Sequence, residues 1–319
     1  MKFKFAALLS VFLIAFGCQN EGASEDESAA ESGSEETQEE SGTITLTDDA
    51  GNEVEVPENP ERIISSYLED DVLTLGETPI VQWSINGGEG IQDYLQAEGL
   101  EGLETIPFDL PYEVIASHEP DLIITSSSEF AEGESYENYS AIAPTFVLEA
   151  FNYDDWRDRL NRVAEIFGKE DVAAEKIEEY ETLAQSVSEK LPADETAIAL
   201  WQTGDTFFIS NVDKSSGEVL YNDLGLSAPD FVEELSSENE TPWLEVSLET
   251  LAESDVDHIF FIGENEGDSE TAFEESVFQN IPAVAEGNVH EYTGDSSWLY
   301  SGYIANTLII EDVEAALAE

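Results

Sequence analysis

Side chains that bind transition metals are scarce in this chain of 319 residues. It has three histidines, His118, His258 and His290, and a single cysteine, Cys18. A protein site for zinc or manganese gathers several His, Cys or carboxylate ligands at one point. Because the three histidines stand beside three different predicted strands, we do not expect them to share a site. The sequence therefore predicts no metal ion held by the protein's own side chains.

Motifs for hydrolysis and for calcium binding are also missing. The sequence contains neither G-x-S-x-G nor H-E-x-x-H, and it has no D-x-[DN]-x-[DN]-G loop. With 73 acidic residues, a close pair of carboxylates would say nothing about acid–base catalysis. The only methionine is Met1, so the iron of a haem could be ligated only by a histidine or a tyrosine. We expect a protein that is not an enzyme and has no cofactor; an extracellular hydrolase is kept as a lesser alternative.

The N-terminus predicts covalent lipid chemistry at Cys18. Lys2 and Lys4 precede the apolar stretch FAALLSVFLIAFG, which is too short to span a bilayer permanently. Cys18 follows directly, in a context that resembles the lipobox of bacterial lipoproteins. We expect residues 1–17 to be a signal peptide and residues 18–41 a lipid-anchored, acidic and flexible tether, because that segment has almost no large apolar side chains. A lone cysteine forms no intramolecular disulfide.

The net charge narrows the choice of partners. Ten Lys+Arg stand against 73 Asp+Glu, which gives a formal charge of -63. Nucleic acids are polyanions, so the charge excludes them as partners. So dense a negative surface favours a saline or alkaline environment, where salt screens the repulsion between carboxylates.

Two twelve-residue stretches are near copies of each other. EVIASHEPDLII covers Glu113–Ile124 and ETLAESDVDHIF covers Glu249–Phe260. Each opens with a glutamate and has an aspartate eight positions later, Asp121 or Asp257. Each predicts a short helix followed by a buried strand. One such unit on either side of the chain's middle indicates two pseudo-symmetric lobes.

Helices and strands alternate along the rest of the chain, which predicts an α/β fold. Residues 43–57 predict a β-hairpin, and 169–191 carry the longest helical pattern, ended by Pro192. We expect two lobes with mainly parallel central sheets joined by that one long α-helix. Shorter helices are predicted at 71–77, 91–100, 217–225 and near the C-terminus. The expected domains are an N-terminal lobe (42–151), interlobe helices (152–191) and a C-terminal lobe (192–319).

The order of these segments resembles the substrate-binding lipoproteins of ABC importers for ferric siderophores. The matching segments are the cysteine, DDAGNEVEVPENPERII, PDLIIT, FGKEDVA, GEVLYNDLGL, WLEVSLETLAESDVDHIFF and IPAVAEGNVHEY. The resemblance implies a fold like the helical-backbone class of periplasmic binding proteins, with the ligand in a cleft between lobes. It also implies a monomer on the extracellular face of the cell membrane, of the Gram-positive type. Its partner would be a permease dimer with a cytoplasmic ATPase.

The resemblance also implies roles for particular residues. Glu113 and Glu249 would dock onto arginines of the permease, one carboxylate for each lobe. A cleft for a chelated ferric ion needs aromatic walls and a few polar donors. The candidate ligand contacts are Tyr67, Trp83, Trp201, Phe207, Lys214, Trp298 and Tyr300. Among these, Trp298 and Tyr300 stand in the polar loop GDSSWLYSG and look least like core residues.

The scarcity of cations favours one ligand class over another. A ferric triscatecholate carries about three negative charges and needs cations around it, because unpaired buried charge is costly. With ten Lys+Arg in the chain, we expect a hydroxamate-type ferric siderophore instead. Cobalamin in the same fold is the main alternative, and an adhesive lipoprotein without a small ligand is another.

Overall fold

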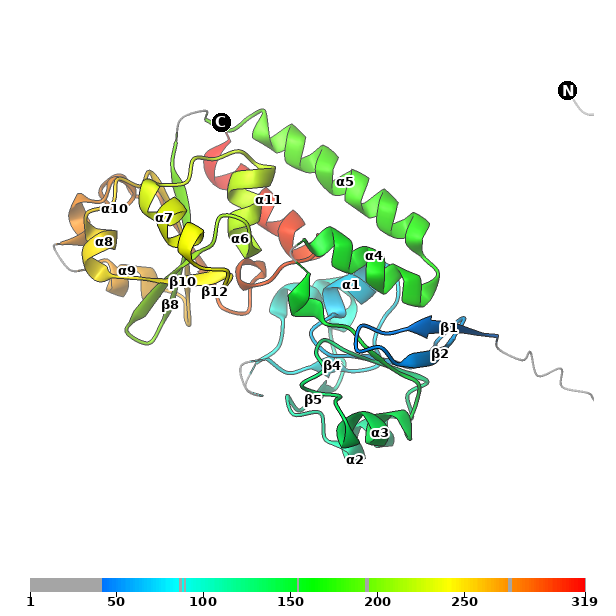
Figure 1. The fold of residues 1–319 in the computed structure, drawn as a ribbon. Coiled ribbons are helices and arrows are strands. Elements are labelled where there is room, and N and C mark those ends of the chain that lie inside the picture. Colours follow the sequence, from blue (N-terminus) through cyan, green and yellow to red (C-terminus); the bar gives the residue numbers. More distant parts are fainter. Residues whose placement is uncertain are drawn as a thin grey trace, which may run out of the picture. The chain divides into compact units, whose positions relative to one another are not determined.

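The computed structural model describes residues 42–85, 88, 90–153, 155–192, 195–274 and 277–318. The predicted signal peptide, Cys18 and the tether lie outside the described residues. We call residues 42–153 the first half and residues 195–318 the second half. Figure 1 shows the chain coloured from the blue first half to the orange and red end of the second.

The first half contains small sheets that each pair strands of this half. The predicted hairpin is confirmed: β1 and β2 are antiparallel, with Ile44 opposite Val56. A three-stranded parallel sheet has the order β3-β6-β7, and a two-stranded parallel sheet pairs β4 with β5. The strands are β1 (Thr43–Thr47), β2 (Glu53–Pro57), β3 (Ile63–Ser65), β4 (Gln82–Trp83), β5 (Thr105–Ile106), β6 (Leu122–Thr125) and β7 (Thr145–Val147).

The second half is built on one five-stranded sheet with the order β10-β9-β8-β11-β12. Strands β8, β11 and β12 are parallel, as expected, but β9 and β10 are antiparallel to their neighbours. The reason is the two-residue turn between Thr203 and Thr206, which reverses the chain through Gly204 at φ +57°. The strands are β8 (Ala197–Thr203), β9 (Thr206–Ser210), β10 (Trp243–Val246), β11 (His258–Gly263) and β12 (Val289–Thr293).

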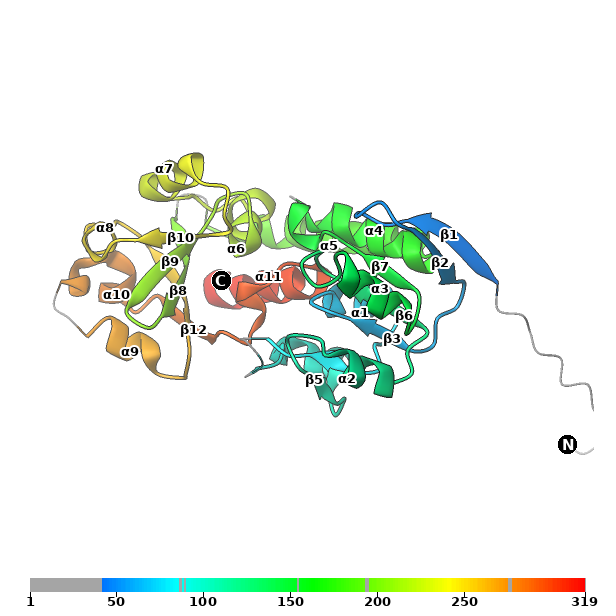
Figure 2. The ribbon, with the colours of Figure 1, turned by 60° about the horizontal axis from the view of Figure 1, so that its bottom comes forward.

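Helices cover these sheets and connect their strands (Figures 1 and 2). The predicted helices at 91–100 and 217–225 are partly π-helical, over Gln96–Leu100 and Glu218–Asp223. The α-helices are α1 (Glu69–Thr74), α2 (Tyr112–Ser117), α3 (Glu134–Ser140), α4 (Trp156–Phe167), α5 (Glu170–Ser188), α6 (Ser215–Gly217), α7 (Asp230–Glu238), α8 (Leu248–Ala252), α9 (Asp268–Ala272), α10 (Pro282–Glu286) and α11 (Tyr303–Leu317).

The repeated stretches fold as matching units, α2 with β6 and α8 with β11. In each, the shared aspartate binds the backbone just before a neighbouring parallel strand. Asp121 accepts hydrogen bonds from the N–H groups of Glu61 and Arg62 at 2.8 and 2.9 Å, beside β3. Asp257 accepts one from the N–H of Thr196 at 2.8 Å, beside β8. The two units belong to different sheets, and within the described residues no strand pairing joins the two halves.

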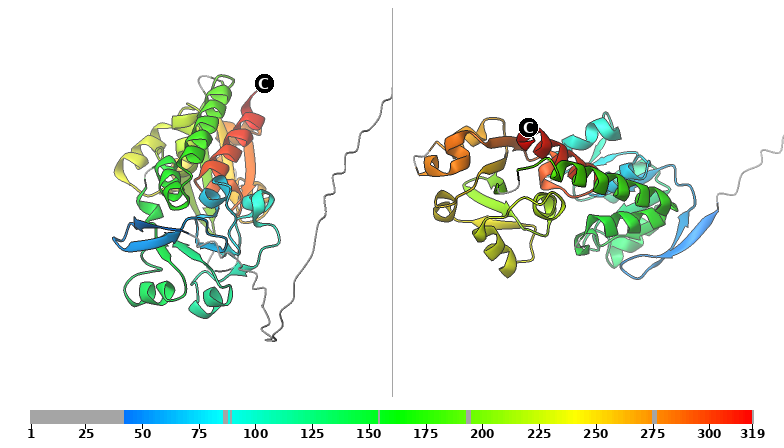
Figure 3. Two further views of the ribbon diagram at one scale, coloured as in Figure 1. Left: turned by 90° about the vertical axis from the view of Figure 1, so that its right-hand side faces the viewer. Right: turned by 90° about the horizontal axis from the view of Figure 1, so that it is seen from above.

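Three helices connect the halves through one continuous apolar core. Helix α4 begins at the N-cap Asp155, which accepts from the N–H of Arg157, and ends at Gly168 in a left-handed conformation. The predicted long helix is confirmed as α5. Its buried Tyr180 and Val187 belong to the same core as Phe146 of the first half and Phe260 of the second. Helices α5 and α11 lie side by side (Figure 3). Lys190, just after α5, forms an ion pair with Glu314 of α11.

The last helix is tied to the first half by a buried carboxylate. Asp70 of α1 accepts hydrogen bonds from the N–H groups of Ile304 and Ala305, at 3.1 and 2.9 Å, in the first turn of α11. These N–H groups have no partner inside the helix, so Asp70 satisfies them. Gly302 permits this approach, because a Cβ at that position would lie 2.5 Å from the carboxyl carbon of Asp70. The sequence analysis did not foresee this contact.

Candidate functional site

A cavity of about 280 Å³ lies where segments of both halves meet. The first half contributes the residues after β3 and β7, and the start of α4, between the two halves, contributes Trp156 and Arg159. The second half contributes the residues around α6, before β10 and before α11. The lining residues are Tyr67, Ala150, Phe151, Tyr153, Trp156, Arg159, Lys214, Ser215, Glu218, Glu240, Pro242, Trp243, Leu299, Tyr300 and Ser301.

Aromatic rings form much of the cavity wall, and they contact one another. The ring of Tyr67 lies 5.5 Å from that of Phe151 and 6.0 Å from that of Tyr300, measured between centroids. Phe151 is 68% exposed, which is unusual for so large an apolar side chain. Burial raises the pKa of Tyr67 and Tyr300, so both phenols stay protonated at neutral pH. The wall thus offers flat apolar surfaces with neutral hydroxyl groups.

Two of the lining residues have strained backbones. Tyr67 has φ +60° and Ser215 has φ +52°, although neither is glycine. Side chains at positive φ cost free energy, and such residues cluster at functional sites, where the surrounding structure holds them in place. Tyr67 and Ser215 come from opposite halves and face the same cavity. The meeting of two such residues at one cavity supports it as a candidate site.

The cations that line the cavity, Arg159 and Lys214, both have interaction partners. Arg159 lies 2.9 Å from Asp71 through its Nε, and it donates to the carbonyl of Ser301 at 2.6 Å. Burial disfavours the charge of Arg159, but Asp71 and Asp70 outweigh that effect and raise its pKa. Lys214 also has an interaction partner. The cavity therefore has little positive charge to spare for an anionic ligand.

A second arginine beside the cavity is surrounded by acids. Arg157 lies 2.9 to 3.1 Å from carboxylate oxygens of Asp155, Glu218 and Asp223. Burial and the neighbouring acids Asp223 and Asp155 raise the pKa of Glu218 to about 7, although Arg157 opposes the shift. One guanidinium cannot neutralise three carboxylates, so this cluster is negative on balance at neutral pH. It holds α4 against the π-helical segment 218–223 of the second half.

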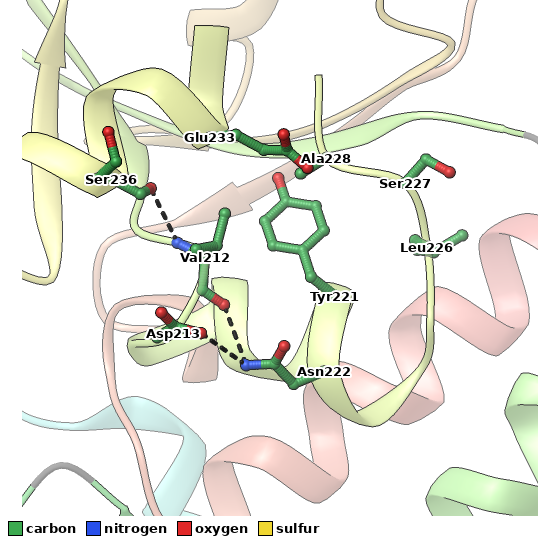
Figure 4. Close-up of a pocket in the computed structure, with 10 residues that line it drawn as sticks. Val212, Asp213, Tyr221, Asn222, Leu226, Ser227, Ala228, Glu233 and Ser236 are labelled. Atoms are coloured by element: carbon green, nitrogen blue, oxygen red, sulfur yellow. Dashed lines mark hydrogen bonds between the residues drawn. The ribbon is translucent and has the colours of Figure 1, made fainter. Parts of the chain in front are cut away.

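A second pocket, shown in Figure 4, lies wholly within the second half. It is larger, about 600 Å³, and Tyr221 stands at its centre. The hydroxyl of Tyr221 already donates to the carbonyl of Ala197 at 2.8 Å. Asn222 donates to the carbonyl of Val212 and to the Asp213 carboxylate, at 3.3 and 3.2 Å. Because Tyr221 and Asn222 already have hydrogen-bond partners and Tyr221 is the aromatic residue of the described lining, we do not take this pocket as the main site.

The structure brings two of the three histidines together. Nδ1 of His258 and Nε2 of His290 are 3.4 Å apart, and His258 Nε2 lies 2.7 Å from a Glu195 carboxylate oxygen. The two histidines meet because β11 and β12 are adjacent parallel strands. Burial and His258 lower the pKa of His290. Within the described residues no group of three or more His, Cys, Asp or Glu could hold a metal ion.

A family model for periplasmic binding proteins matches residues 107–296, more than half of the chain. The chain belongs to the periplasmic binding protein family. As expected for such a binding protein, the α/β fold and the long helix α5 are present. In the described part of the binding protein, no helix has the length and apolarity needed to cross a membrane.

Curated relatives cover almost the whole binding protein. The probable siderophore-binding lipoprotein YfiY of Bacillus subtilis is 28% identical, over 98% of this chain and 97% of its own length. The iron(3+)-hydroxamate-binding protein FhuD of the same organism is 26% identical, over 90% of this chain and 88% of its own.

Solved structures support the fold. A FhuD-fold-family component of a ferrichrome ABC transporter from Bacillus subtilis has a TM-score of 0.72 at 23% identity, covering 85% of this chain and 99% of its own. FhuD2 from Staphylococcus aureus with bound ferrioxamine B has a TM-score of 0.65 at 20% identity. The match covers 81% of this chain and 98% of the FhuD2 chain.

The structure brings some of the sequence-predicted ligand contacts to the cavity. Tyr67, Lys214 and Tyr300 line it. Trp83 and Trp201 stand one layer behind: the ring of Trp83 lies 5.7 Å from that of Tyr67, and the ring of Trp201 lies 5.7 Å from that of Trp243. These two tryptophans support the wall without lining it.

Two other candidates lie away from the cavity. Phe207 is buried in a core on the opposite face of the second sheet, because side chains alternate along β9 and the aromatic ring on the face of Trp201 belongs to Phe208. The sequence context of Trp298 predicted a residue outside the core, and this prediction is wrong. It is fully buried, stacks on Phe260 at 4.6 Å and donates to Asp312.

Sequence reasoning missed several lining residues. Phe151 and Trp243 stand outside the patterns used to choose candidates, and Trp156 lies in the predicted interlobe helices (152–191), where a large aromatic side chain is expected to be buried. Trp156 is indeed 2% exposed, yet it lines the cavity, and its indole N–H has no hydrogen-bond partner within the described residues. A buried donor without a partner is uncommon in proteins and is available to a ligand. Aromatic residues at segment ends would have been the useful signal.

Proposed function

We propose that this binding protein captures a ferric hydroxamate siderophore in the cavity between its halves and delivers it to an ABC-type permease for iron uptake. The observation that supports it most is the wall of contacting aromatic rings drawn from both halves. Such walls suit a bulky chelate with an apolar periphery. The relatives are named for siderophore or iron(3+)-hydroxamate binding.

The charge of the cavity supports hydroxamates over catecholates. Arg159 and Lys214 already have partners, and the acids around Arg157 outnumber it. A complex with three negative charges would enter without free cations to meet it, at a high desolvation cost. A neutral or cationic ferric complex avoids that cost.

Delivery would use the two exposed faces that carry the repeated units. Glu113 and Glu249 are both exposed, in the first turns of α2 and α8. Each directly follows an exposed apolar residue, Tyr112 at 36% and Leu248 at 52% exposure. We propose that each carboxylate, with its apolar neighbour, docks onto one subunit of a permease dimer coupled to a cytoplasmic ATPase. Lipid attachment at Cys18 would hold the monomer at the extracellular face of the membrane.

The capture proposal is tested by tryptophan fluorescence. The chain has five tryptophans, of which Trp156 and Trp243 line the cavity. Ferrioxamine-type or ferrichrome-type complexes should quench the emission at saturable, stoichiometric concentrations, whereas ferric citrate and catecholates should bind more weakly. Trp298→Phe should keep most of the quenching and Trp243→Phe should lose part of it. Absence of quenching by every ferric chelate, with quenching by cobalamin, would replace the proposed ligand.

The docking proposal is tested by charge reversal. Glu113→Lys combined with Glu249→Lys should abolish uptake of the ferric complex by cells while the purified variant binds it with unchanged affinity. Reversal of two exposed glutamates outside the repeated units, Glu104 and Glu178 of α5, serves as the matched control for net charge. Normal uptake by the first variant would refute the docking role.

A further inference from the structure

One segment of the cavity rim is held in place by a buried amide. Asn211 is 3% exposed, and its side-chain amide donates to the carbonyls of Asn239 and Thr241, at 3.0 and 3.2 Å. Its backbone N–H donates to the carbonyl of Pro242 at 2.9 Å. These three bonds fix the peptide groups on both sides of Glu240. The position of Glu240 at the cavity is therefore set by the core of the second half.

Of the carboxylates among the described lining residues, Glu240 is the one without a hydrogen-bond or ion-pair partner there. Glu218, which also lines the cavity, pairs with Arg157 at 3.1 Å. Glu240 is exposed and makes no hydrogen bond or ion pair within the described part of the chain. The cavity cations have partners of their own, Asp71 in the case of Arg159. A carboxylate of the described lining that has no partner there therefore lies on the rim, where a ligand can meet it.

The neighbouring wall suits a cation as well. Trp243 lines the cavity three positions after Glu240, and its ring is supported by Trp201 at 5.7 Å. An ammonium group gains from a carboxylate and from the face of an indole ring. A carboxylate and an indole on one rigid segment would bind an ammonium group together.

We propose that Glu240 is a specificity-determining residue that selects ferric hydroxamate complexes with a protonated amine arm. The inference rests on the proposed capture of ferric hydroxamates and adds the chemical class of their substituent. The iron cage lies against the aromatic wall, and the amine reaches the rim at Glu240 and Trp243. A neutral complex binds to the same wall without that contact.

The experiment compares two ligands that differ in one charge. Ferrioxamine B has a free primary amine, and its N-acetyl derivative has the same iron cage without the positive charge. Fluorescence titrations with the wild-type protein, Glu240→Gln and Glu238→Gln give the ratio of the two affinities. Glu238 is also exposed and near the rim segment but does not line the cavity, so its variant corrects for the protein's overall negative field.

The expected result is a preference of about fivefold for the amine complex in the wild type and in Glu238→Gln, and no preference in Glu240→Gln. The preference should shrink in 0.5 M salt, because exposed charges are screened. Equal affinities of the wild type for both ligands would refute the role of Glu240 while capture stands. An equal loss in both glutamine variants would assign the preference to the overall field and also refute it. If neither complex binds, the proposed capture fails and this inference fails with it.

Discussion

Glu69, beneath the cavity, is a buried carboxyl whose replacement tests how burial of an acid affects the stability of the protein at different pH values. Its carboxyl is 1% exposed, one oxygen accepts from the N–H of Trp83 at 3.0 Å, and the other has no partner within the described residues. Burial is the main cause that raises its pKa from 4.5 to about 7, against hydrogen bonds from backbone N–H groups that lower it. We predict that Glu69→Gln stabilises the protein in alkaline solution but not in acid.

The sign follows from proton linkage. Because the pKa is higher in the folded state, the folded protein holds this proton between pH 4.5 and 7 while the unfolded chain loses it. The contribution of Glu69 to stability is thus fully present below pH 4.5 and is lost as the pH rises through about 7. Glutamine keeps the carbonyl that accepts from Trp83 and has no proton to lose. Relative to wild type, the variant should gain about 2.5 kcal/mol between pH 5 and pH 8.5.

Urea unfolding followed by tryptophan fluorescence, at several pH values and constant salt, measures this difference. The sequence pI is near 4.1, so the protein remains negative throughout the range. Glu104→Gln, an exposed change in the same half, should show a flat difference from wild type. A pH-independent difference for Glu69→Gln, or one that falls with rising pH, would refute the reasoning about the buried carboxyl.

Three further predictions concern charge, packing and the cavity wall. With a net charge of -63, the melting temperature should rise from low salt to 1 M salt, and an unchanged temperature in calorimetry would contradict the role of repulsion. Gly302→Ala should destabilise the fold by about 2 kcal/mol, because the added Cβ would press on Asp70. Gly294→Ala should cost little, because its Cβ would meet its nearest neighbour at 3.6 Å. Similar urea midpoints for the two variants would refute the close approach of Gly302 to Asp70. Trp243→Ala should weaken binding of a ferric hydroxamate about tenfold in titrations, and unchanged affinity would remove Trp243 from the site.

The sequence predicted most of the architecture because its signals are local. The DDAGN turn marked the hairpin, Pro192 marked the end of the long helical pattern, and the repeated stretches marked two equivalent αβ units. Alternation within β9 was the weak point. Thr206–Ser210 carries two adjacent phenylalanines, and nothing in the local pattern says which one lies on the side of Trp201.

The candidate site was harder to predict because it depends on contacts between distant segments. In the sequence, Tyr67 is well over a hundred positions from both Lys214 and Tyr300, yet all three line one cavity. Trp298 shows the opposite error, since a polar sequence context did not prevent its burial against Phe260. The acid Asp312, which accepts from its indole N–H, lies in the next helix and gave no signal beforehand.

The bonds from Ile304 and Ala305 to Asp70 have a consequence for biosynthesis. They join residues 234 and 235 positions apart, so the packing of the first half around Asp70 is complete only after the last helix has formed. A nascent polypeptide that has not yet produced α11 leaves Asp70 without these donors and leaves the apolar residues that pack on Ala305 uncovered. Such long-range closure slows folding. The sequence predicts an export signal at residues 1–17. With such a signal, slow closure would extend the time in which a translocase can still thread the polypeptide through a membrane.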